Sequence, residues 1–139
     1  MIAKNAYLSV CALVGAAVLA IAGGCANTPP VTPEQQVHTL ADGRWQALLA
    51  GKHEAAYEMT APSFRKSTSF DSYRQKQGGA LQWTGFEVVS VKCEPNACNV
   101  RLRINASAIA GIGYRGPITT AVDEAWVLED GRWWLLPKS

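Results

Sequence analysis

Apolar residues recur three or four positions apart along residues 33–50, at Val37, Leu40, Ala41, Trp45, Leu48 and Leu49. This spacing predicts an amphipathic helix with one buried face. Thr32 and Gln35 form a capping box at its start, and Gly51 is a natural stop. The other side of the helix is expected to carry the polar residues, namely His38, Asp42 and Arg44.

Two shorter helices are predicted to follow. The first covers residues 53–59 and packs through Ala55, Ala56 and Tyr57, and the sequence Ala61-Pro62-Ser63 is expected to break the chain after it. The second begins after Ser69, a good capping residue, and continues through residue 77.

From residue 83 the pattern changes to that of β-strands. Residues 86–92 are rich in β-branched side chains, and residues 99–105 alternate between apolar and polar types. The alternation predicts that three residues of the second strand face the core, namely Val100, Leu102 and Ile104.

Two further strands are expected at residues 118–128 and 132–136, joined by a tight turn at Asp130-Gly131. Helices that come before two antiparallel hairpins are typical of the α+β class. We therefore expect N-terminal helices packed on a curved, four-stranded antiparallel sheet, with a signal helix ahead of them.

Cys93 and Cys98 flank a turn that carries Pro95 and Asn96 in its two central positions. The two cysteines face each other across the base of the hairpin, at a spacing that a disulfide can bridge. In an exported protein a disulfide is favoured, and the alternative is a pair of reduced, buried thiols. Because no histidine lies near them, we predict neither a metal site nor a cofactor.

The long capped helix, the helix of His53-Glu54-Ala55-Ala56-Tyr57 and the final hairpin resemble nuclear-transport-factor-two-like domains, also called cystatin-like or SnoaL-like cone domains. The resemblance covers roughly residues 33–137. It implies a cone with a pocket between the long helix and the sheet, where family enzymes such as ketosteroid isomerases and polyketide cyclases place Asp, Tyr or His. No such catalytic set can be matched here, and Trp45 stands where the isomerases carry a tyrosine.

Residues 1–24 have the layout of an export signal. Lys4 gives a cationic start, residues 6–22 carry no charge, and small residues follow. Because the pair Gly23-Gly24 directly precedes Cys25, the segment resembles a bacterial lipoprotein signal with a lipobox, although Ala22 stands where that family favours leucine.

The lipoprotein resemblance implies an acylated Cys25, a tether over residues 25–32 and a single domain over residues 33–139. Ala26 in place of an aspartate favours the periplasmic face of the outer membrane. Two alternatives stay open, namely cleavage by an ordinary signal peptidase after residues 20–22 and an uncleaved membrane span. Acylation also accounts for a cysteine count of 4, since Cys11 leaves with the signal and Cys25 is otherwise an odd thiol.

The charge balance excludes one class of function. The net charge is only +2 and no run of Lys or Arg is present. Nucleic-acid binding requires a basic patch or stripe, so we set this class aside.

The residues predicted to line a pocket are Trp45, Tyr57, Tyr73, Asp123 and Glu124. Asp123 and Glu124 are adjacent on a strand, so only one of them can face the pocket. The other is expected to be exposed and to pair with Arg101 or Arg103. Both tyrosines are expected to be half-buried, with hydroxyls in water. His53, at a helix start, is interpreted as a surface residue.

Trp133 and Trp134 must face opposite sides of the last strand, one in the core and one outside. The outward ring, together with Arg101 and Arg103, is a candidate surface for a partner or a second copy of the chain. The alternative is that a long arginine side chain covers it.

These features predict a non-enzymatic binding or interaction module at the outer membrane, with no catalytic residue assigned. Its partners are the membrane, through the lipid, and a small apolar ligand or a periplasmic protein. One alternative is a small pocket enzyme of the isomerase, cyclase or lyase type. The other is a structural module that forms a homodimer.

Overall fold

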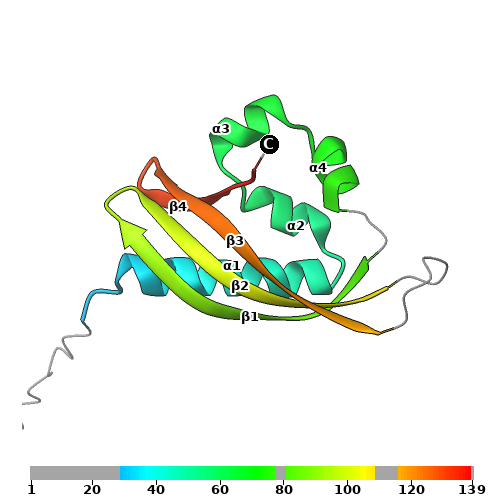
Figure 1. The fold of residues 1–139 in the computed structure, drawn as a ribbon. Helices are drawn as coiled ribbons and strands as arrows, with labels where there is room; N and C mark the ends of the chain where they lie inside the picture. Colours follow the sequence, from blue (N-terminus) through cyan, green and yellow to red (C-terminus); the bar gives the residue numbers. More distant parts are fainter. Residues whose placement is uncertain (1–28, 78–80, 109–115, 139) are drawn as a thin grey trace, which may run out of the picture.

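Helix α1 (Pro33–Leu49) lies along a four-stranded antiparallel sheet (Figure 1). The computed structural model describes residues 29–77, 81–108 and 116–138. The strands follow one another in sequence order across the sheet. The other elements are α2 (His53–Glu58), α3 (Pro62–Ser67), α4 (Phe70–Gln77), β1 (Leu81–Glu94), β2 (Ala97–Ala108), β3 (Pro117–Glu129) and β4 (Arg132–Leu136).

This is the predicted α+β order, with helices ahead of a four-stranded antiparallel sheet. The predicted signal over residues 1–24, the predicted acylation site Cys25 and residues 26–28 of the predicted tether lie outside the described residues. No helix in the described ranges is both long enough and apolar enough to cross a membrane.

Helix α1 begins as its sequence predicts. The Thr32 hydroxyl accepts a hydrogen bond from the Gln35 backbone (3.3 Å), and the Gln35 side chain accepts one from the Thr32 backbone (3.0 Å). Past its end, Gly51 adopts a left-handed φ of 70°, which glycine reaches without strain.

One residue of α1 contradicts the predicted polarity of its faces. Arg44 was expected on the solvent side, but it is only 4% exposed. It lies seven residues after Val37 and three after Ala41, both fully buried, so the helical period places it on the inner face. A charged side chain is tolerated there because it has a buried partner, Glu124.

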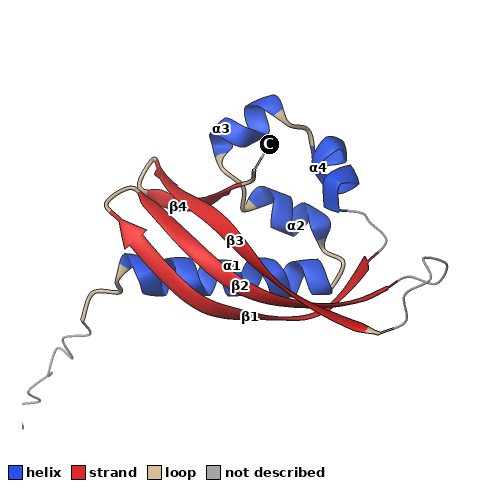
Figure 2. Ribbon diagram, viewed as in Figure 1, coloured by secondary structure: helices blue, strands red, loops and turns tan. Residues whose placement is uncertain are grey.

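The segment at Pro62 is the second difference from the prediction. It does end α2, but it also starts the extra helix α3, because proline at the first position needs no backbone N–H partner. Just before it, the Ala61 backbone donates to the Leu135 carbonyl (2.7 Å) and the Leu135 backbone donates to the Met59 carbonyl (3.0 Å). This short segment therefore lines the outer edge of β4, and α2, α3 and α4 gather on that side of the sheet (Figure 2).

The two hairpins follow the predicted alternation and turns. The β2 residues Val100, Leu102 and Ile104 are fully buried, and the residues between them are exposed. Cys93 is paired with Cys98 across the first hairpin, with their sulfurs 2.01 Å apart, which agrees with the predicted disulfide. The second hairpin turns at Asp130 and Gly131, whose φ angles of 51° and 73° are those of a tight two-residue turn.

The core lies between α1 and one face of the sheet. Its buried residues are Val37, Ala41, Trp45, Leu48, Ala56, Cys98, Val100, Leu102, Ile104, Trp126, Trp133 and Leu135. The opposite face of the sheet is polar. It carries an ion pair between Arg101 and Asp123 (3.0 Å) and a second between Arg103 and Glu87.

Candidate functional site

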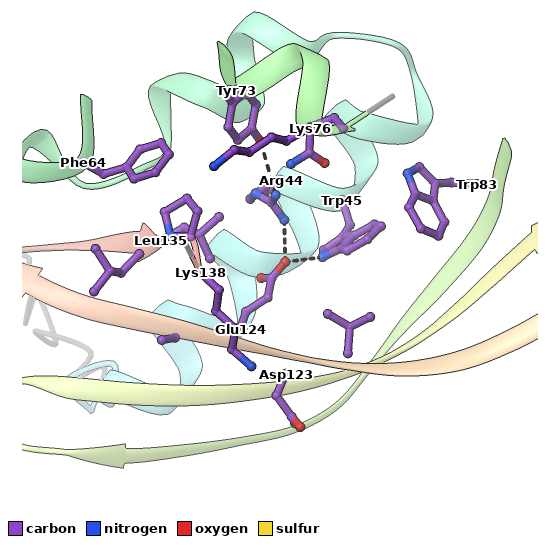
Figure 3. A pocket seen from close by; sticks show the side chains of 15 residues that line it. Arg44, Trp45, Phe64, Tyr73, Lys76, Trp83, Asp123, Glu124, Leu135 and Lys138 are labelled. Atoms are coloured by element: carbon purple, nitrogen blue, oxygen red, sulfur yellow. Dashed lines mark hydrogen bonds and ion pairs between the residues drawn. The ribbon is translucent and has the colours of Figure 1, made fainter. Parts of the chain in front are cut away.

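A cavity of about 360 Å³ opens between α1, α4 and the β3–β4 end of the sheet (Figure 3). Its apolar walls include the rings of Trp45 from α1, Phe64 from α3 and Trp83 from β1. The Trp45 and Trp83 rings meet edge to face, with centroids 5.8 Å apart. The cavity is at the lower end of the size range of small-molecule sites, about 300–1,000 Å³.

A buried ion pair forms the polar centre of this cavity. Arg44 Nη1 lies 2.5 Å from Glu124 Oε1, and the two side chains are 5% and 7% exposed. Burying such a pair is tolerated only where further hydrogen bonds satisfy the remaining polar atoms. The indole of Trp45 donates to the same carboxylate oxygen (2.8 Å), and that of Trp126 donates to the other (3.2 Å).

The arginine is held from its other side by Tyr73. Arg44 Nη2 donates to the Tyr73 hydroxyl (3.3 Å), and Tyr73 is only 2% exposed. The guanidinium thus bridges α4 to β3 (Figure 3). Its Nε has no hydrogen-bond partner among the described residues.

This geometry gives Glu124 a structural role. Three N–H donors, from Arg44, Trp45 and Trp126, are directed at its two oxygens. A general base needs a carboxylate that can reach the proton it abstracts. Because Glu124 is engaged by its own protein on both oxygens, it is poorly placed to take a proton from a bound molecule.

Three of the five predicted pocket residues are brought together, namely Trp45, Tyr73 and Glu124. Asp123 borders the cavity through its position on β3, but its side chain points to the opposite face (Figure 3) and pairs with Arg101. The predicted split between the two adjacent acidic residues is therefore correct, and Arg101 is the partner.

The prediction of half-buried tyrosines is wrong, because both residues are buried. Tyr57 is only 9% exposed, and its hydroxyl donates to the Thr68 carbonyl (2.6 Å). Its ring packs on Tyr73, with centroids 5.3 Å apart, in a small aromatic cluster among the short helices. Tyr57 therefore supports the wall behind Tyr73 and does not line the cavity.

The predicted partner surface is divided between the core and the outer face of the sheet. Trp133 is buried in the core, whereas Trp134 faces outward. The cationic groups of Arg132 and Arg65 lie 4.5 Å and 5.2 Å from the Trp134 ring, so arginine covers it, as the alternative interpretation stated. Arg101 and Arg103 are each engaged in an ion pair.

The remaining candidates give no further site. His53 begins α2 and is partly buried, with no hydrogen-bond partner for its Nδ1 among the described residues. In the ranges that the structure describes, no three His, Cys, Asp or Glu side chains come close enough to hold a metal ion.

Sequence reasoning missed Arg44 and two lysines at the rim of the cavity, Lys76 and Lys138. The sequence does indicate a buried position for Arg44, because this residue continues the spacing of the buried residues of α1. No sequence pattern indicates the two lysines, because they lie 62 positions apart in the sequence and only the fold brings them to one cavity.

Comparison with protein-family models and with curated proteins gives no significant match. Among solved structures, the fold is similar to the solution structure of a SEC-C motif-containing protein from Rhodopseudomonas palustris. The TM-score is 0.53 at 14% identity, with 69% of this chain and 71% of that chain covered. At this identity the similarity shows a related fold alone.

Proposed function

We propose that this protein is a lipoprotein of the outer membrane, facing the periplasm, whose domain binds a small apolar ligand and catalyses no reaction. The anchor is the acylated Cys25, which follows a removed signal helix over residues 1–24. The domain is a nuclear-transport-factor-two-like cone, in which the sheet is curved around α1. The order of helices and strands and the place of the cavity support this assignment.

One observation carries the binding function, namely the cavity of about 360 Å³ walled by Trp45, Phe64 and Trp83. Concave sites with mostly apolar walls and a few polar groups are the usual form of small-molecule sites. The engaged state of Glu124 favours a binding role over the alternative of an isomerase, cyclase or lyase. The ion pairs on the outer face of the sheet favour a solvated surface over a homodimer contact.

We expect the full chain, purified in nonionic detergent micelles, to bind 2-naphthamide, a neutral flat aromatic molecule. Val122→Phe places a ring in the cavity lining, and it is expected to weaken binding at least about tenfold because it fills the ligand's space. Isothermal titration calorimetry measures this, with protein-free micelles as the blank.

The matched control is Ala121→Phe, which adds a ring at an exposed position one residue away. It is expected to change the affinity by no more than about twofold, as surface substitutions usually do. Thermal unfolding of both variants checks that they fold. If Val122→Phe binds 2-naphthamide as well as the unchanged chain, the cavity is not the binding site and the proposed function is wrong.

The anchor is tested separately from the cavity. Cys25→Ser removes the acylated sulfur, and the protein is expected to move from the membrane fraction to the soluble periplasmic fraction. Each buried CH₂ of an acyl chain contributes about 0.8 kcal/mol to membrane binding, so loss of the chains removes the anchor. Cys11→Ser, within the predicted signal, is the control and is expected to leave the protein in the membrane. A Cys25→Ser protein that stays membrane-bound contradicts the lipid anchor.

A further inference from the structure

The cavity carries an excess of positive charge. Its lining includes three cations, Arg44, Lys76 and Lys138, and one carboxylate that faces inward, Glu124. The other acidic residue of the lining, Asp123, is neutralised on the opposite face by Arg101 at 3.0 Å. Arg44 and Glu124 balance each other, so the two lysines leave a net charge of about +2 at the cavity.

The two lysines come from separate parts of the chain. Lys76 is in the last turn of α4, and Lys138 follows β4. Within the described residues neither ammonium group takes part in an ion pair. Lys138 also borders a neighbouring, more open hollow of about 460 Å³, which shares Phe64 with the cavity. Lys138 therefore lies where the two hollows adjoin.

The polar groups of the cavity are mostly hydrogen-bond donors. An arginine carries five N–H donors, and the structure uses two of those of Arg44. The Tyr73 hydroxyl accepts from Arg44, so its own proton remains available to donate. Accepting a bond from a cation makes this hydroxyl a stronger donor. Donors of this kind are suited to anionic oxygens.

From these observations we infer that the ligand of the cavity is an organic anion with a flat apolar body and a carboxylate head. The inference rests on the proposed binding function and adds the charge of the ligand. The aromatic rings of Trp45, Trp83 and Phe64 contact the body. Lys76, Lys138 and the Tyr73 hydroxyl receive the carboxylate.

The test compares two probes of the same shape, 2-naphthoate and 2-naphthamide, with the full chain in nonionic micelles at neutral pH. We expect 2-naphthoate to bind about five- to tenfold more tightly, since partly exposed charges contribute modestly. The double variant K76Q/K138Q is expected to lose this preference, so that it binds the two probes about equally. The control K66Q/K92Q removes the same charge at two exposed lysines outside the cavity lining, and it is expected to keep the preference.

The outcomes separate the inference from the proposed function. If both probes bind equally, the ligand is not selected by charge, and the inference is overturned while small-molecule binding stands. A preference that survives in K76Q/K138Q overturns the assignment of the two lysines. If neither probe binds, the proposed function fails, and the inference fails with it.

Discussion

Glu124→Leu is expected to lower the free energy of unfolding by about 3–5 kcal/mol, the usual effect of removing one partner of a buried ion pair. The substitution leaves the Arg44 guanidinium, only 4% exposed, without its counter-charge. It also removes the acceptor for the indoles of Trp45 and Trp126. Urea unfolding followed by circular dichroism measures the loss.

The double variant R44M/E124L distinguishes the ion pair from packing. Replacing a buried ion pair by apolar residues of similar size is often neutral or stabilising. We therefore expect the double variant to regain most of the stability that Glu124→Leu alone loses, which gives a large coupling energy in the double-mutant cycle.

The control lies at the next residue. Asp123→Asn removes the carboxylate that pairs with Arg101 at 3.0 Å, but this pair is on the outer face and is partly exposed. Exposed ion pairs contribute about 0–1 kcal/mol. If Glu124→Leu is no more damaging than Asp123→Asn, the buried pair does not hold the cavity together.

Much of the fold is predictable because local signals agree with the final structure. The capping box of Thr32 and Gln35 forms both of its hydrogen bonds. The Asp130-Gly131 turn adopts the expected left-handed angles. The alternation in β2 gives the buried face directly, since side chains on a strand point to alternate sides.

The wrong predictions concern residue types that can occupy two different structural positions. Proline ends one helix and is also well suited to begin the next, so the break predicted at Pro62 is also the start of α3. Arginine is usually solvated, which favours the solvent side for Arg44, but its spacing matches the buried face. Its partner Glu124 is 80 residues away in the sequence, and only the tertiary structure brings the two together.

The candidate site was partly predictable from the periodicity of its helix and strand. The helical period places Trp45 on the inner face of α1, and the strand period shows that only one of Asp123 and Glu124 faces inward, without showing which. The charge of the cavity depends on Lys76, in the last turn of α4, and on Lys138, which follows β4. The periodicity of a helix or strand indicates little about where a side chain points at or beyond the end of the element. Arg44 and Glu124 thus connect the elements around the cavity, and in the proposed binding function the two lysines at the rim supply its positive charge.

Trp133→Ala and Trp134→Ala are expected to differ strongly although the two residues are neighbours. Trp133 is 9% exposed and packs in the core between α1 and the sheet. Removing a buried tryptophan side chain costs about 3–5 kcal/mol, through lost burial and the cavity that remains. Trp134 lies on the other face and is half-buried.

For Trp134→Ala we expect a loss of about 1–2 kcal/mol, from the contacts of its ring with Arg65 and Arg132 and from partial burial. Urea unfolding of the two variants under the same conditions measures the difference. The Trp134 variant also serves as the control, since it removes the same side chain at the next position. Equal losses would contradict the assignment of Trp133 to the core. A change in ligand affinity for Trp134→Ala would contradict its place outside the cavity, because neither its ring nor the arginines that cover it line that site.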